Sequence, residues 1–200
     1  MATRDIQAFR KALARHLYPV LRDEGFKGSG ATLRRIAGPV VHVFNVQGSD
    51  GGQRCYLNVG AHLAFLPQVS EKAPDALLEY DCAFRERINP HGQAGLGWSY
   101  GDSEDELDAN ARATVAAWAS QGRPFMARHG RWPEAFAALV ADFDVQGGHP
   151  MTGHTFALIA LELGDARRAQ AIAEAALGNT PERASGLRHA LRQFLAGLPT

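Results

Sequence analysis

Residues 40–65 read VVHVFNVQGSDGGQRCYLNVGAHLAF, and this stretch decides the fold. β-Branched and aromatic residues fill both of its ends, and the glycine-rich residues 48–52 between them are a strong turn signal. Two such runs joined by a short turn are typical of an antiparallel hairpin. The sequence therefore predicts strands over 40–47 and 54–65 that pair with each other.

The segments on either side of this hairpin extend the pattern. Residues 31–36 and 83–88 are two further predicted strands, each followed by a glycine- and proline-containing turn. Near the start of the chain, apolar residues recur at helical spacing from Ile6 to Leu21, and Gly25 is placed to end that helix. We expect an α+β fold in which an N-terminal helix packs on an antiparallel sheet of about four strands.

The second half of the chain is predicted to be all-helical. Ser103 and Glu106 form a capping box at the start of one helix. From Trp132 onward, apolar residues recur only at helical spacing. The expected organisation is a helix-plus-sheet domain over residues 1–101 and a helical region over residues 102–200, packed on it or appended to it.

Composition narrows the choice of partners and compartment. Lys plus Arg and Asp plus Glu both number 21, and nucleic-acid or anionic-membrane binders usually carry a basic excess, so neither partner is expected. The chain opens with an amphipathic pattern and contains no apolar run long enough to cross a bilayer, which predicts a cytoplasmic protein. Cys55 and Cys82 lie outside any C-x-x-C motif, so two buried thiols are expected, with one disulfide as the alternative.

Several different short motifs follow one another in a defined order along residues 4–100. The helix ends in Gly-Phe-Lys at residues 25–27. Strand-like motifs follow at residues 32–35, 43–49, 56–60 and 82–88, and Trp98 comes last. In these motifs the chain resembles a bacterial family catalogued as domain of unknown function 4304. The resemblance implies a helix packed on an antiparallel sheet and brings no established activity.

A second pattern lies near residues 155–181. Leucines at helical spacing lead to Gly164-Asp165, and alanines follow at 169, 173 and 176. This segment resembles one tetratricopeptide unit, a pair of antiparallel helices used in protein-binding arrays. Because a solenoid needs about three or more units, a single hairpin is expected to pack with its helical neighbours and points only to partner binding.

Polar residues alternate along the central hairpin. Within each of its strands the polar side chains share one face, and the register decides whether the two faces coincide. If they do, the amide and imidazole groups, together with two arginines of the next strand, could bind a peptide backbone, a carboxylate or a phosphate. The alternative is the ordinary polar face of a one-sided sheet. The candidate binding residues are Asn45, Gln47, Asn58, His62, Arg85 and Arg87.

No catalytic or cofactor motif stands out. His149 and His154 lack the i, i+4 spacing of a helical zinc site, and we expect them to cap or pack. The glycine-rich stretches lack the Lys-Ser/Thr ending of a phosphate loop, and no G-x-S-x-G elbow is present. The sequence predicts no catalytic residue, no metal site and no cofactor.

The sequence is compatible with three functional hypotheses. The leading hypothesis is a non-enzymatic protein-binding module, of which an immunity-type protein that neutralises a cognate toxin is one specific version. The alternative is an enzyme or a small-ligand-binding protein that uses a cleft between the sheet and the helices. The third is a structural domain without a site. The sequence leaves the oligomeric state open.

Overall fold

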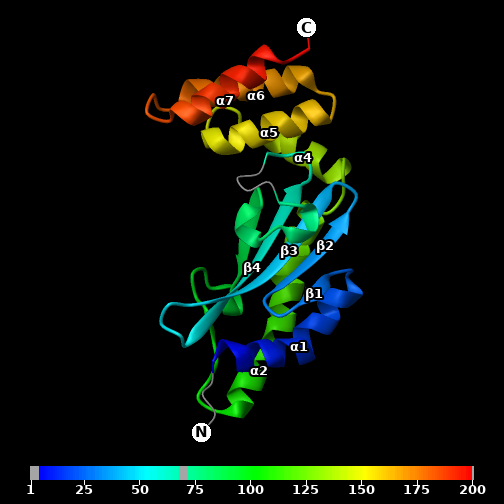
Figure 1. Ribbon diagram of the computed structural model, residues 1–200, viewed down its shortest axis with the longest axis vertical. Coiled ribbons are helices and arrows are strands. Elements are labelled where there is room, and N and C mark those ends of the chain that lie inside the picture. The colour runs from blue at the N-terminus through cyan, green and yellow to red at the C-terminus, as the bar shows by residue number, and fades with distance from the viewer. Residues whose placement is uncertain (1–4, 68–71, 200) are drawn as a thin grey trace. The chain divides into compact units, whose positions relative to one another are not determined.

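A computed structural model describes residues 5–67 and 72–199 (Figure 1). It contains two compact units, of which one ends at Gly130 and the next begins at Arg131. The expected boundary lay between residues 101 and 102. Helix α2 (Glu104–Ala117) instead belongs to the first unit, because it packs against helix α1 (Ile6–Asp23).

Helix α1 forms where the apolar spacing predicts it. The carboxylate of Asp5 accepts hydrogen bonds from the backbone N–H groups of Gln7 and Ala8, which caps the first turn. Phe9, Leu13 and Leu17 lie on one stripe and are fully buried. The helix ends at Asp23, and Gly25 two residues later has a φ of 91°, which suits a residue without a side chain. This stripe forms one side of the main core.

Within residues 5–67 and 72–199 the sheet has six strands, all paired antiparallel, so the predicted α+β class is confirmed. The order is β1-β2-β3-β4-β5, and β6 also pairs with β4. The two strands beyond the expected four are very short, and their glycine-rich surroundings give no strand pattern in the sequence. The bounds are β1 Lys27–Ser29, β2 Thr32–Ala37, β3 Val40–Gly48, β4 Arg54–Leu63, β5 Phe84–Ile88 and β6 Trp98–Ser99.

The two faces of the sheet have different coverings. Alternate residues such as Phe44, Leu57 and Val59 join α1 and α2 in the main core. On the opposite face, Val41 and Val43 are covered by Leu77 and Cys82, which lie in the connection between β4 and β5. That connection contains the short 3-10 helices η1 (Pro74–Ala76) and η2 (Glu79–Asp81). It covers only part of the second face.

The two cysteines lie on opposite sides of the sheet. Cys55 belongs to the main core, whereas Cys82 belongs to the smaller cluster on the second face. Both are buried and free, and burial raises the pKa of each thiol to about 12. The prediction of two buried thiols is confirmed.

Beyond α2, the first unit continues through a π-helix, η4 (Trp118–Gly122), into α3 (Arg123–Arg128). The second unit is helical, with α4 Glu134–Asp142, α5 Pro150–Glu162, α6 Ala166–Asn179 and α7 Ser185–Ala196. Helices α5 and α6 form the hairpin that the repeat resemblance implies, and the Asp165 carboxylate caps α6 by accepting from the N–H of Arg168. Among the described residues, no helix has the length and apolar character needed to span a membrane.

Candidate functional site

An open pocket with a volume of about 770 Å³ lies on the second face of the sheet. Strands β3, β4 and β5 supply one part of its lining, and the residues in and around η2 supply the rest. Polar and charged side chains dominate. The lining residues are Asn45, Gln47, Asn58, Leu78, Glu79, Tyr80, Ala83, Arg85, Glu86 and Arg87.

The strand register explains why these residues meet. Asn45 of β3 lies opposite Asn58 of β4, and Asn58 in turn lies opposite Arg87 of β5. Two positions along the same face, Gly60 lies opposite Arg85. Because side chains alternate along a strand, a one-residue change of register would have placed these groups on opposite faces. Five of the six candidate residues from the sequence therefore line one pocket.

A buried asparagine organises part of the pocket. Asn58 is only 4% exposed. Its Nδ2 donates to Oε1 of Gln47 at 3.2 Å, and its Oδ1 accepts from Nε of Arg87 at 3.4 Å. The Arg87 guanidinium also lies over the ring of Tyr56, with Cζ 4.1 Å from the ring centroid. These two contacts orient Arg87, and its two terminal nitrogens form no hydrogen bond with the described residues, so they can bind a ligand.

Asn45 plays a different part. Its Nδ2 donates to Oγ1 of Thr32 at 3.0 Å and to the backbone oxygen of Ala31 at 3.3 Å. The side chain amide is therefore committed to strand β2 and the turn before it. Asn45 contributes surface to the pocket, whereas Gln47, Asn58 and the arginines supply its directed polar groups.

Arg85 is the free cation of the described pocket lining. Its side chain is exposed and forms no hydrogen bond or ion pair with the residues that the structure describes. Glu79 faces the two arginines: burial raises the pKa of its carboxyl, and the positive charges of Arg85 and Arg87 partly oppose that rise. The other acidic residue of the lining, Glu86, is already ion-paired with Arg128 at 3.0 Å.

His62 does not join the cluster. It lies on the predicted face of β4, opposite Val41, but it is only 1% exposed and does not line the pocket. The connection between β4 and β5 folds over this end of the sheet and buries the ring. Burial lowers the pKa of His62, while the Leu66 backbone and the Asp81 carboxylate act in the opposite direction. The expectation that His62 belongs with the other candidates is corrected accordingly.

The residues that sequence reasoning missed come mainly from the covering connection. Glu79 and Tyr80 belong to η2, which no helical or strand periodicity marks, so nothing in the sequence indicated that this segment folds back onto the sheet. Tyr56 could have been predicted from the sequence, because it lies two residues before Asn58 and therefore on the same face of β4. The alternation of residues along a strand predicts which strand residues line such a pocket, but it does not predict which residues of a connecting segment pack beside them.

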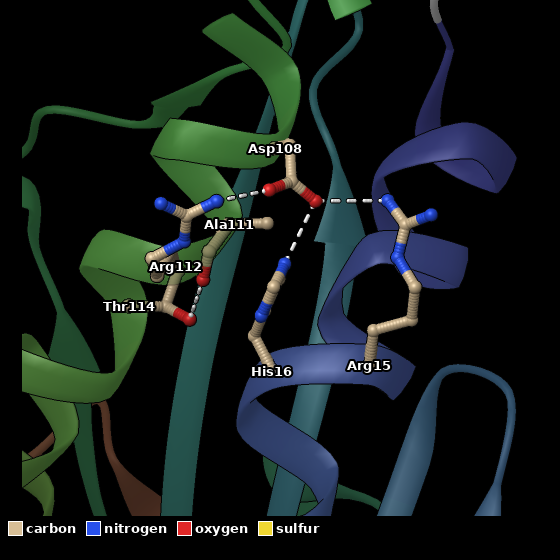
Figure 2. A network of polar contacts seen from close by, with 6 residues as sticks. All are labelled: Arg15, His16, Asp108, Ala111, Arg112 and Thr114. Carbon is tan, nitrogen blue, oxygen red and sulfur yellow. Dashed lines mark hydrogen bonds and ion pairs between the residues drawn. The ribbon is translucent and has the colours of Figure 1, made fainter. Parts of the chain in front are cut away.

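A second polar cluster, between α1 and α2, places a histidine beside an aspartate, as in a catalytic His–Asp pair. The Asp108 carboxylate accepts hydrogen bonds from His16 Nε2 at 2.7 Å, Arg15 Nη2 at 2.9 Å and Arg112 Nη2 at 2.6 Å (Figure 2). Thr114 is fully buried and donates to the Ala111 oxygen of its own helix, so its hydroxyl is not directed at the imidazole. The cluster is best understood as a clamp between two helices.

The remaining histidine candidates have structural roles. Nδ1 of His149 accepts from the N–H of Met151 at the start of α5, and the His154 ring meets Phe194 edge-on with centroids 6.3 Å apart. The prediction that they cap and pack is confirmed. In the part of the chain that the structure describes, no three His, Cys, Asp or Glu residues are close enough together to hold a metal ion.

Comparison with known proteins gives one match. The model of the family described as Domain of unknown function (DUF4304) matches residues 17–128, which is more than half of the chain and agrees with the resemblance found in its motifs. No curated protein and no solved structure matches this chain. The matched range includes every strand of the sheet and all of the pocket lining.

Proposed function

We propose that this chain, which belongs to the DUF4304 family, is a protein-binding module whose pocket receives an acidic segment of a partner protein. The observation that carries this proposal is the pair of exposed arginines in the pocket. Arg87 is held in position by Asn58 and Tyr56, and Arg85 has no ion-pair partner among the described residues. Both guanidinium groups are available for a bidentate contact with a carboxylate.

The make-up of the pocket favours a protein over a small molecule as ligand. The pocket is open, and Tyr80 at its wall is 64% exposed. Tyrosine and arginine are among the residue types that most often carry the binding energy of protein interfaces. The side-chain amide of Gln47 adds a group that can hydrogen-bond to a peptide backbone.

The chemistry of the lining favours binding over catalysis. The described lining contains no serine, cysteine, histidine or lysine, so carboxylates and the Tyr80 hydroxyl are its only groups of a type that can act as a nucleophile. Burial raises the pKa of Glu79, but the other carboxylate of the described lining, Glu86, is ion-paired with Arg128 and does not form an acid–base pair with it. A non-enzymatic role accounts for these groups with fewer assumptions.

Affinity capture from native lysate tests the proposal. The double variant Arg85→Ala/Arg87→Ala should lose a partner that the wild type retains. The matched control is Arg22→Ala/Arg167→Ala, which removes two exposed arginines outside the pocket and should retain the partner. Circular dichroism shows whether each variant is folded. A partner that the folded pocket variant still retains would refute the proposal.

A small anionic ligand is the second candidate. The volume of about 770 Å³ falls within the range of small-molecule sites, roughly 300–1,000 Å³. A thermal-shift screen with carboxylates and phosphate esters tests it. A compound that raises the melting temperature of the wild type, but not of Arg85→Ala/Arg87→Ala, would move this candidate to first place.

A further inference from the structure

We infer that the pocket selects a single carboxylate, presented by a glutamate or aspartate side chain of the partner, against a phosphate dianion, and that Glu79 is the residue that sets this preference. The inference rests on the proposed function, because it names the chemical group that the same pocket takes.

The charges of the described lining are the first argument. Arg85 and Arg87 contribute two positive charges, and Glu79 contributes one negative charge. Glu86 adds nothing, since Arg128 already pairs with it. One positive charge remains, which a single carboxylate neutralises. A phosphorylated side chain carries about 1.5 to 2 negative charges at neutral pH and would leave the pocket with a negative excess.

The geometry of Arg87 is the second argument. Nε of its guanidinium is occupied by Asn58, and one face of its plane lies on Tyr56. The two terminal nitrogens remain, and they match the two oxygens of a carboxylate through a pair of parallel hydrogen bonds. Arg85 projects from the same face two residues away, roughly 7 Å along the strand, so it is placed to balance the charge of Glu79.

Glu79 itself is the third argument. It is half-buried, and burial alone disfavours its charged form. Arg85 and Arg87 are the charges that offset this cost. A phosphate dianion would engage both arginines and leave the Glu79 carboxylate beside a second anion, whereas a single carboxylate on Arg87 leaves Arg85 for Glu79. Glu79 therefore repels a bound phosphate dianion more strongly than a bound carboxylate.

Two peptides of equal length test the inference on the full chain. One is acetyl-Gly-Thr-Glu-Thr-Gly-amide, and the other carries phosphoserine in place of its glutamate. Each is titrated at pH 7 while NMR follows the side-chain Nε–H signals of Arg85 and Arg87. We expect the wild type to bind the glutamate peptide more tightly. In Glu79→Gln the ratio of the two affinities should shift toward the phosphopeptide by about tenfold, as expected for removal of one nearby charge.

The control Glu79→Asp keeps the charge and should keep the wild-type order. Equal affinities for the two peptides in the wild type, or a ratio that Glu79→Gln leaves unchanged, would overturn the selectivity and leave the acidic-segment proposal standing. If neither peptide shifts the signals of the two arginines at millimolar concentration, both the selectivity and the acidic-segment proposal are overturned. Unchanged backbone spectra of the two variants would show that the pocket is still folded.

Discussion

Nε of Arg87 donates to Oδ1 of Asn58 across 3.4 Å, so a buried amide on the central strand β4 orients an exposed cation on the neighbouring strand β5. The same asparagine donates to Gln47 on the other neighbouring strand, β3. One side chain thus connects three strands across the pocket. A guanidinium that is already oriented loses less conformational freedom when it binds a ligand.

Replacing Asn58 by alanine should weaken ligand binding without removing a charge. Arg87 would lose its hydrogen bond and the orientation that it provides. We expect the glutamate peptide to bind several-fold more weakly and the free energy of unfolding to fall by about 1 kcal/mol. Calorimetric titration and urea unfolding measure the two effects.

Asn45→Ala is the matched control for this prediction. The Asn45 amide bonds to Ala31 and Thr32 and does not contact Arg87. The variant Asn45→Ala should reduce the free energy of unfolding by a similar amount and leave the affinity for the glutamate peptide almost unchanged. If both asparagine variants weakened binding equally, the orienting role of Asn58 would be wrong.

The strand residues of this site were predictable from the sequence, whereas the residues contributed by η2 in the connection between β4 and β5 were not. Alternation along 40–47 and 54–65 places Asn45, Gln47 and Asn58 on one face, and the turn between the strands fixes a register that brings them together. His62 follows the same alternation yet is buried, because the connection between β4 and β5 covers its end of the sheet. Periodicity reports the face on which a residue lies and carries no information about what later packs on that face.

Gly60 explains how that connection comes so close to the sheet. A Cβ atom at this position would lie 2.8 Å from both Cβ and Sγ of Cys82. Gly60→Ala should therefore lower the free energy of unfolding by roughly 1–3 kcal/mol, because the connection must move away from β4. Thermal unfolding measures the loss.

Gly51→Ala is the control for this substitution, because a Cβ there meets no atom within 4 Å and the backbone has no positive φ. It should leave stability nearly unchanged. In a double-mutant cycle, Cys82→Gly should recover part of the loss caused by Gly60→Ala, since it removes the contacted atoms. The absence of any coupling between the two positions would show that the contact does not limit the approach.

Two buried histidines should make the first unit sensitive to acid. Nε2 of His42 donates to the backbone oxygen of His129 at 3.0 Å, and Nδ1 of His129 donates to the Phe125 oxygen at 3.0 Å. Burial, chiefly, lowers the pKa of each from 6.5 to about 4. Between these values the unfolded chain binds protons that the folded chain does not. Stability should therefore be full above about pH 6.5 and fall by up to about 1.4 kcal/mol per pH unit for each histidine down to about pH 4.

The variant His42→Gln isolates one of these two contributions. Glutamine keeps a hydrogen-bond donor but does not titrate. Urea unfolding at pH 7 and pH 5 should show a smaller loss of stability on acidification in the variant than in the wild type. An identical loss in both proteins would mean that His42 is protonated equally readily in the folded and unfolded states.

The helical unit depends on an arginine that caps a neighbouring helix. Nη2 of Arg168 in α6 lies within hydrogen-bonding distance of the backbone oxygens of Val140, Ala141 and Phe143, where α4 ends. Charged donors at the last carbonyls of a helix stabilise it. Arg168→Ala should therefore destabilise this unit by about 1.5–3 kcal/mol and lower the hydrogen-exchange protection of the last turn of α4. Arg167→Ala, an exposed neighbour, should change neither quantity.

The clamp between α1 and α2 should depend on the charge of Asp108 (Figure 2). Hydrogen bonds from His16 and Arg112 hold the pKa of this carboxyl below its usual 3.8. Because the folded pKa lies below the unfolded one, the carboxylate contributes its stability above about pH 4 and loses it as the pH falls through the folded value. Asp108→Asn should therefore be less stable than the wild type at pH 7, and the difference should shrink below pH 4. Asp50→Asn removes an exposed carboxylate in the turn after β3 that forms no ion pair with the described residues, and should show no such pH-dependent difference. A gap between wild type and Asp108→Asn that stayed constant from pH 7 to pH 3 would mean that the side chain acts through its shape and hydrogen bonds, since a contribution from charge has to disappear on protonation.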